Sequence, residues 1–380
     1  IPFTYDWINR LNGVDLPKEE IDGYLARLEI RVEDGCAIPP SYRGDLEHKA
    51  DLAEEVARLY GYNRLPTTPL VGLAEGTVTP RQHFDRRIHQ LLLGQGLSEI
   101  LTYSFISPKL YDKIALPRDS ALRRSVTILN PLGEDTSVMR TTAIPSMLQV
   151  LATNYNNRNP QAALYEVAVQ YLPKEDRELP EERPAVVLGL YGGGRDFYDL
   201  KGMVELLLER LGVRDCRYAA WEQNPTFHPG RCARVTSADG QVLGVLGQVH
   251  PQVCQAFGLD ADTYLASLDG DLLYACHKDD RRYAPLPKFP ASTRDLALTC
   301  DESLPAADLE TVIRQKGGRL LEAVDLFDVY RGAQIAPGKK SVAYALTLRS
   351  ADHTLTVEEC DGVMARILAG LEEIGAQIRK

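Results

Sequence analysis

Four acidic side chains lie close together near the beginning of the chain: Asp45, Asp51, Glu54 and Glu55. The spacing of Leu52, Val56 and Leu59 predicts a helix whose first turns carry the last three of these acids. Carboxylate oxygens grouped in this way can hold Mg²⁺ while the ion keeps several of its waters. Acids near a helix N-terminus are also favoured by the helix dipole, at about 0.3–1 kcal/mol each, and spacing alone favours this second explanation.

The segments before this helix predict a small winged-helix-like unit. Helices are expected at about 6–11 and 18–28, and a hairpin at 29–38 that turns at Asp34-Gly35. A winged helix suggests DNA binding. The nearby arginines, however, are interleaved with the acids, which makes a poor surface for reading a DNA groove: Arg43, Arg58 and Arg64.

The middle of the chain predicts a helix packed beside a half-buried strand. A Pro-, Gly- and Thr-rich linker at 66–80, a helix at 81–94 and a strand at 96–107 are expected first. Thr141-Thr142 is a suitable helix beginning, and Pro145 falls where a helix tolerates proline. The following strand, 161–172, places Tyr165 and Val167 on one face and Glu166 on the other.

The last 95 residues, 286–380, predict the order β-α-β-β-α-β of a ferredoxin-like fold. Strands are expected at 294–300, 320–332 and 340–350, with a helix beginning after Pro305 and ending at Gly317-Gly318. Thr356 and Glu359 form the pattern of a capping box at the start of a second helix. Because this fold serves many functions, its topology alone assigns none.

Bulk properties indicate an ordinary globular protein of two or three domains. The chain has 380 residues and a formal net charge of −10, which argues against a general nucleic-acid coat and against binding to an anionic membrane. No apolar run reaches the ~18 residues of a membrane span. The 7 cysteines are scattered without a CxxC pair, as expected for reduced thiols in a cytoplasmic protein. The first residue, Ile1, suggests a processed or truncated piece.

Several stretches carry a resemblance to one family. They are SYRGDLEHKADLAEEVARLYGYN (41–63), NPLGEDTSVMRTT (130–142), NYNNRNPQAALYEVAVQYL (154–172) and KFPASTRDLAL (288–298). In order and over essentially the whole chain, they resemble the β subunits of bacterial phenylalanyl-tRNA synthetases. The resemblance implies an α+β multidomain protein: a winged-helix-like B5 domain at 1–68, a non-catalytic, class II synthetase-like antiparallel-sheet domain at 69–285, and a ferredoxin-like anticodon-binding domain at 286–380.

The same resemblance implies a Mg²⁺ site shared with an α subunit. Its ligands from this chain would be Asp45, Asp51, Glu54 and Glu55. The expected assembly is an α2β2 enzyme in which α uses ATP to activate phenylalanine and transfers it to tRNA-Phe. This chain would scaffold α, share the Mg²⁺ and hold the tRNA, without contacting a membrane.

The chain is expected to hold no catalytic residue and to bind no ATP productively. An active class II synthetase directs arginines at the phosphates of ATP, but the strand 161–172 holds Glu166 and no arginine. No GxGxGxxR sequence is present, and Gly192-Gly193-Gly194-Arg195 has the wrong spacing, so we interpret it as a tight loop. His228 and His250 each lack a nucleophile or acid at a set spacing and are interpreted as packed turn residues.

For tRNA contacts, the resemblance and the preference of RNA readers for aromatic and arginine side chains point to four residues: Arg294, Tyr330, Lys339 and Lys340. Each has a plainer alternative, since Arg294 can pair with Asp295 or Asp328 and the two lysines can belong to a solvated turn. Full-length family members carry a tRNA-binding and an editing domain that precede this part, so we expect this chain not to hydrolyse Tyr-tRNA-Phe.

Two other functions remain open at this point. A free-standing, non-catalytic nucleic-acid-binding protein built from the same domains would not associate with an α subunit. An autonomous synthetase would need phosphate-binding arginines that the sequence does not place in the expected motifs.

Overall fold

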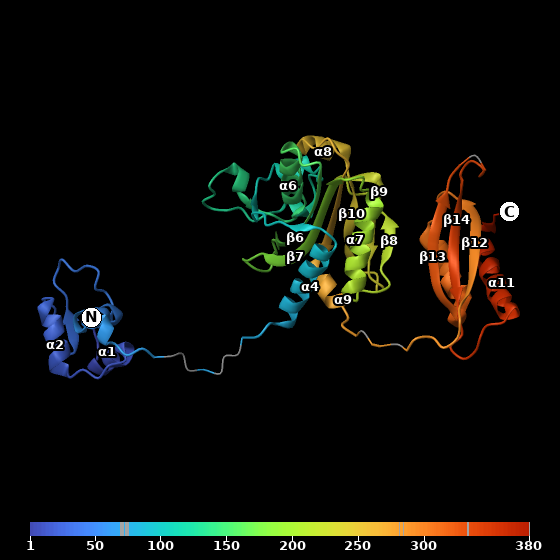
Figure 1. Ribbon diagram of the computed structural model, residues 1–380. Coiled ribbons are helices and arrows are strands. Elements are labelled where there is room, and N and C mark those ends of the chain that lie inside the picture. The colour runs from blue at the N-terminus through green and yellow to red at the C-terminus, as the bar shows by residue number, and fades with distance from the viewer. Residues whose placement is uncertain (69–71, 73–75, 281, 284, 333, 380) are drawn as a thin grey trace. The chain divides into compact units, whose positions relative to one another are not determined.

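The computed structural model describes residues 1–68, 72, 76–280, 282–283, 285–332 and 334–379 (Figure 1). The chain divides into two units, Ile1–His89 and Gln90–Lys380, and the described part of the second contains a seven-stranded sheet, a four-stranded sheet and a two-stranded sheet. Part of the expected linker, residues 69–71 and 73–75, lies outside the described residues. None of the helices in the described ranges is long and apolar enough to cross a membrane.

The first unit has the expected order of helix, helix, hairpin and helix. Its elements are α1 (Tyr5–Asn12), α2 (Lys18–Arg27), β1 (Arg31–Glu33), β2 (Cys36–Ile38), α3 (Lys49–Tyr60) and the 3-10 helix η1 (Tyr62–Arg64). Asp34 and Gly35 both have positive φ, of 49° and 78°, which is the backbone of a two-residue hairpin turn. Ile21, Leu52 and Val56 are fully buried where α2 and α3 pack together, so this unit has its own core.

The next part of the chain contains a seven-stranded sheet in the order β3-β6-β7-β11-β10-β9-β8. Its elements are α4 (Pro80–Gly94), β3 (Ser98–Glu99), β4 (Phe105–Ile106), α5 (Leu110–Lys113), η2 (Ala121–Arg123), η3 (Glu134–Thr136), β5 (Val138–Met139), α6 (Ile144–Asn156), β6 (Gln161–Leu172), β7 (Glu181–Gly192), α7 (Phe197–Arg210), β8 (Arg217–Ala220), β9 (Phe227–Thr236), β10 (Val242–Val249), α8 (Pro251–Phe257), β11 (Thr263–Asp269) and α9 (Gly270–Cys276). β3 pairs parallel to β6, and the other pairs are antiparallel.

Helices cover both faces of this sheet. α6 packs on β6 and β7, where a Cβ on Gly189 would lie 2.8 Å from the side chain of Met147. α7 packs on β10 and β11 and crosses the other face (Figure 1). Because both faces are covered, β6 is not the half-buried strand that its alternation predicts, and the face that carries Glu166 is buried.

Two local predictions for this part of the chain are wrong. The strand expected at 96–107 is interrupted, because only β3 and β4 pair with other strands. Thr102, between them, instead hydrogen-bonds to Glu166. The helix expected from Thr141 begins at Ile144, because the hydroxyl of Thr141 contacts Tyr111 and the carbonyl of Leu122.

The last part of the chain forms a four-stranded antiparallel sheet in the order β13-β14-β12-β15. Its elements are β12 (Ser292–Asp301), α10 (Ala306–Gly317), η4 (Gly318–Leu320), β13 (Leu321–Tyr330), β14 (Lys339–Leu348), α11 (Val357–Glu373) and β15 (Gln377–Ile378). Thr356 and Glu359 form the predicted capping box. Leu309, Ile367 and Leu371 bury the helices against one face of the sheet, so the ferredoxin-like prediction is confirmed.

Candidate functional site

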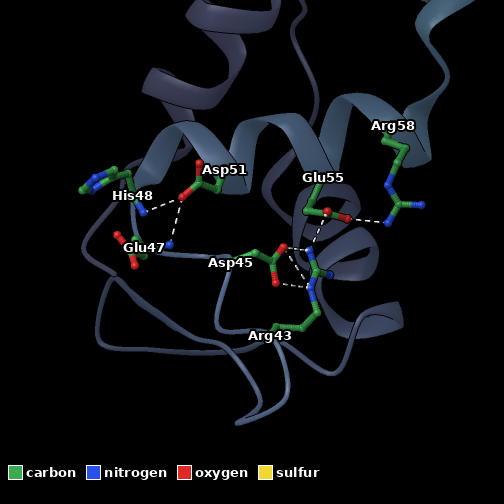
Figure 2. A network of polar contacts seen from close by, with 7 residues as sticks. All are labelled: Arg43, Asp45, Glu47, His48, Asp51, Glu55 and Arg58. Carbon is green, nitrogen blue, oxygen red and sulfur yellow. Dashed lines mark hydrogen bonds and ion pairs between the residues drawn. The ribbon is translucent and has the colours of Figure 1, made fainter. Parts of the chain in front are cut away.

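Three of the four candidate ligands, Asp45, Asp51 and Glu55, lie in the loop before α3 and on that helix (Figure 2). Oδ2 of Asp51 accepts hydrogen bonds from the backbone N–H groups of His48, at 2.7 Å, and Glu47, at 2.9 Å. These two bonds lower the pKa of Asp51 below its usual value. Asp51 therefore satisfies backbone donors that precede the helix, which is the structural role that the dipole explanation foresees.

Asp45 and Glu55 are joined through one arginine (Figure 2). Nη2 of Arg43 lies 2.7 Å from Oδ2 of Asp45 and 2.8 Å from Oε1 of Glu55, and its Nε lies 2.9 Å from Oδ1 of Asp45. The hydrogen bonds from Arg43 lower the pKa of Asp45 to about 2. Burial alone would raise the pKa of Glu55, but hydrogen bonds from Arg58 and Arg43 outweigh it and the pKa is lowered.

The donor types of this cluster suit Mg²⁺, which prefers carboxylate oxygens and keeps several waters. The arrangement of these carboxylates does not suit Mg²⁺. The guanidinium of Arg43 lies between Asp45 and Glu55, and the carboxylate of Asp51 accepts from backbone N–H groups. Glu54 is exposed on α3. Among the described residues, no group of three or more His, Cys, Asp or Glu is placed to hold a metal ion. The four acids as arranged therefore do not fit a magnesium ion.

The middle sheet holds a buried ion pair at the strand where a class II catalyst would present an arginine. Nη2 of Arg140 lies 3.0 Å from Oε1 of Glu166, and both side chains are only 3% exposed. The other donors of Arg140 are satisfied by the carbonyl of Val169 and the hydroxyl of Thr102. Arg140 precedes α6 and lies outside the strand, so the strand sequence does not reveal it as the partner of Glu166.

This geometry leaves the Arg140 cation unavailable to a phosphate, because all its neighbours are protein groups inside the domain. The Gly192–Gly194 segment has positive φ throughout, and a Cβ on Gly192 would lie 2.2 Å from the carbonyl oxygen of Pro160. It is therefore the tight loop that the sequence predicts. His250 caps α8 through Nδ1, whereas His228 lies in β9 and not in a turn.

Three of the four residues predicted to contact tRNA lie near one end of the last sheet. Lys339 forms an ion pair of 2.7 Å with Asp301. Lys340 is only 7% exposed and donates to the carbonyl of Glu302. Both lysines belong to β14, so the alternative that they form a solvated turn is wrong. Tyr330 pairs with Ser341 in the sheet, and the guanidinium of Arg379 lies 5.4 Å from its ring centroid.

Arg294 lies near the other end of the sheet. It pairs with Leu346, whereas Cys300 pairs with Lys340, so six positions of β14, or about 20 Å, separate Arg294 from the lysines. Arg294 donates to the hydroxyl of Ser292 and the carbonyl of Thr293, and not to Asp295 or Asp328.

Phe327, which is not among the four predicted residues, is exposed at a bulge in the edge strand β13. An aromatic residue exposed in this way resembles the stacking side chains that RNA readers use. The signal available in the sequence was an aromatic residue within the strand motif LFDVYRG, 326–332.

Comparison with known proteins identifies each part of the chain. Residues 1–62 match the tRNA synthetase B5 domain, 65–270 the phenylalanyl tRNA synthetase beta chain CLM domain, and 287–379 the ferredoxin-fold anticodon binding domain. Proteins named phenylalanine–tRNA ligase beta subunit from Clostridium acetobutylicum, Clostridium tetani and Moorella thermoacetica are 44%, 42% and 40% identical to it. These alignments cover 100%, 98% and 98% of the chain and 48% of each relative.

The chain thus spans about half the length of the curated relatives that it matches. The CLM match alone covers more than half of its 380 residues, and the three matches follow one another in the order expected from the sequence. The chain belongs to the family of phenylalanyl-tRNA synthetase beta chains.

Proposed function

We propose that this chain is the part of a phenylalanine–tRNA ligase β subunit that supports attachment of phenylalanine to tRNA-Phe by an α subunit. The observation that carries the proposal is the ordered match of three family models to successive parts of the chain. The α subunit uses ATP and Mg²⁺ for activation and transfer, in an α2β2 enzyme of the cytoplasm. This chain binds no ATP productively, which the enclosed Arg140–Glu166 pair supports.

An exposed apolar surface supports the proposal of a partner subunit. Leu101, Tyr103 and Phe105 are exposed at alternate positions that lead into β4. Leu129 and Leu132, which follow the segment that pairs with the other side of β5, are fully exposed. Apolar side chains gathered at the surface in this way mark places where another protein binds. We assign this surface, defined by these five residues, to the α subunit.

The remaining assignments belong to the same proposal. The domains are 1–68, 69–285 and 286–380. The last of these binds tRNA-Phe through Tyr330, Lys339 and Arg294, whereas the buried Lys340 donates to the carbonyl of Glu302 and has a structural role. The Mg²⁺ assignment of Asp45, Asp51, Glu54 and Glu55 requires that the α subunit supply further ligands and that these acids be rearranged, because in this chain Arg43 and backbone N–H groups occupy oxygens of three of them.

Phenylalanine-dependent exchange between ATP and pyrophosphate tests the function. The chain alone should be inactive, and addition of the cognate α subunit should produce exchange and co-elution in size-exclusion chromatography. Exchange by the chain alone would show that it is an autonomous synthetase. Separate elution of the two proteins would favour a free-standing nucleic-acid-binding protein.

A pair of substitutions tests the metal assignment. Asp51→Ala combined with Glu54→Ala should remove Mg²⁺ from the complex with α, measured by metal analysis after gel filtration. If Mg²⁺ stays and only the stability of the first unit falls, the two acids act on the helix alone.

A further inference from the structure

A cavity of about 490 Å³ lies in the middle domain, where α7 begins beside the strands β8, β9 and β11 (Figure 1). Ala220 and Ala233, which pair across β8 and β9, line it, and their short side chains leave the space open. Cavities of roughly 300–1,000 Å³ with aromatic walls and a few polar groups are the usual sites of small ligands. This cavity has four aromatic side chains and two cations in its walls: Phe197, Tyr198, Tyr218, Tyr264, Lys201 and Arg231.

Arg231 is held at the cavity by a buried amide. In the pairing of β9 with β10, residues 228–231 oppose Gln248 alone, so β9 bulges where Arg231 lies. Oε1 of Gln248 accepts from Nη1 of Arg231 at 2.5 Å, and Nε2 of Gln248 donates to Oδ1 of Asp262 at 2.7 Å. Gln248 is only 3% exposed, so an amide bonded at both ends fixes the direction of the guanidinium. The described residues offer Arg231 no other hydrogen bond or ion pair, which leaves Nε and Nη2 able to bind an anion.

Two tyrosine hydroxyls at the cavity have no hydrogen-bond partner among the described residues. One belongs to Tyr264, whose side chain is only 5% exposed, and the other to Tyr218. Burial raises the pKa of Tyr264, and among the nearby charges that of Arg231 acts to lower it, which places this hydroxyl beside the guanidinium. Buried hydroxyls are normally paired, so the two tyrosines indicate a place where a ligand supplies the missing partners.

The acids near the cavity are engaged in contacts of their own. Oδ1 of Asp196 accepts from two backbone N–H groups at the beginning of α7, and Oδ2 of Asp199 accepts from the N–H of Asp196, so these two carboxylates form the capping box of the helix. Nζ of Lys201 pairs with Glu205 and lies 4.7 Å from the ring centroid of Tyr218. Because the side chain of Glu205 is 46% exposed, solvent screens this pair and the ammonium can also serve an anion in the cavity.

We propose that this cavity binds a nucleoside monophosphate, with its base against the aromatic walls and its phosphate on Arg231, Lys201 and the hydroxyl of Tyr264. A guanidinium with two free donors matches the oxygens of a phosphate, and aromatic rings stack on any base. A phosphate monoester carries a charge of about −1.5 to −2 at pH 7, which two cations balance. The proposal goes beyond the ligase function and assigns no catalytic step to the chain.

Equilibrium dialysis of the full chain with labelled adenosine 5′-monophosphate tests the site. One molecule should bind per chain. Adenosine and inorganic phosphate, the two halves of the probe, should each compete at least about tenfold more weakly than the intact nucleotide. No retention of the nucleotide at millimolar concentration, or equal competition by either half, would overturn the proposal.

A pair of arginine substitutions shows whether the retained nucleotide lies in this cavity. Arg231→Gln should weaken binding about ten- to hundredfold, the loss of a hydrogen bond between charged groups. Arg234→Gln is the matched control, because Arg234 is exposed in the same strand and does not line the cavity, and it should bind like the unchanged chain. Equal affinity in the two variants would overturn the proposal.

A measurement on the unchanged chain covers the case in which Arg231→Gln fails to fold. Phenylglyoxal modifies accessible guanidinium groups, and both Arg231 and Arg234 are exposed. Adenosine 5′-monophosphate should protect Arg231 from the reagent and leave Arg234 reactive, as read by mass spectrometry of the peptides. Saturation with the nucleotide without protection of Arg231 would overturn the proposal.

A dinucleotide distinguishes a free mononucleotide from an unpaired nucleotide of an RNA strand. Adenylyl-adenosine without a terminal phosphate should bind more weakly than adenosine 5′-monophosphate, because its phosphodiester carries a single charge. Tighter binding of the dinucleotide would overturn the assignment to a free mononucleotide.

Discussion

The carboxylate of Glu166 and the guanidinium of Arg140 form an ion pair of 3.0 Å that is almost completely enclosed. Glu166 lies on β6 and Arg140 lies just before α6, so the pair joins the sheet to the segment that leads into the helix covering it. Thr102 hydrogen-bonds to both side chains. The guanidinium of Arg140 is therefore part of the internal structure of the domain.

Removal of one partner of this pair should destabilise the middle domain strongly. Arg140→Met leaves the charge of Glu166 buried without a cation, at a cost of about 3–5 kcal/mol in the free energy of unfolding. Urea unfolding measures the loss, and Arg31→Ala, at an exposed ion pair, should change stability by less than about 1 kcal/mol. The double variant Arg140→Met with Glu166→Leu should lose less of the free energy of unfolding than Arg140→Met alone. An equal or larger loss would contradict the ion-pair explanation.

Charges placed on the apolar surface should prevent assembly with the α subunit. Leu129→Asp with Leu132→Asp puts two carboxylates where the proposed interface excludes water, so the affinity measured by analytical ultracentrifugation should fall at least about a hundredfold. Leu179→Asp is the matched control, since Leu179 is exposed in the connection between β6 and β7. If the double variant and Leu179→Asp bind the α subunit equally well, the interface lies elsewhere.

Low pH should reduce the free energy of unfolding of the chain, partly through protonation of Glu181. Hydrogen bonds from Lys174 and Arg183 lower its pKa from 4.5 to about 2 in the folded chain. As the pH falls, the Glu181 carboxylate therefore takes up a proton in the unfolded chain before it does so in the folded chain. The contribution of Glu181 to the free energy of unfolding is present above about pH 4.5 and is lost as the pH falls toward 2. Glu181→Gln should lower the urea midpoint at pH 6 and match the unchanged chain near pH 2. Glu178→Gln, in the connection between β6 and β7, is the matched control and should leave the urea midpoint at pH 6 unchanged.

Substitutions in the last domain should separate tRNA contacts from structural ones. Tyr330→Ala removes a surface on which a base can stack, so tRNA-Phe affinity measured by filter binding should fall about 5- to 150-fold. Lys340→Met should leave that affinity unchanged and lower the melting temperature, because the buried ammonium donates to the carbonyl of Glu302. Loss of tRNA affinity in Lys340→Met with an unchanged melting temperature would reverse these roles.

The sequence alone determined the elements of the first unit and of the last domain. Both consist of short-range patterns, such as the hairpin turn at Asp34-Gly35 and the capping box of Thr356 and Glu359, whose physics acts within a few residues. The residues of the motifs also predicted the family, which the comparisons with known proteins confirm.

Only the tertiary structure decided what the charged residues do. Arg140 and Glu166 are 26 positions apart and Arg43 and Glu55 are 12 apart, so nothing in their local sequence pairs them. The alternation of residue types along β6 predicted one solvated face, but the tertiary structure covers both faces of this strand. Partners and dielectric surroundings of a charge depend on which segments fold against it, and the pattern of one segment does not contain that information.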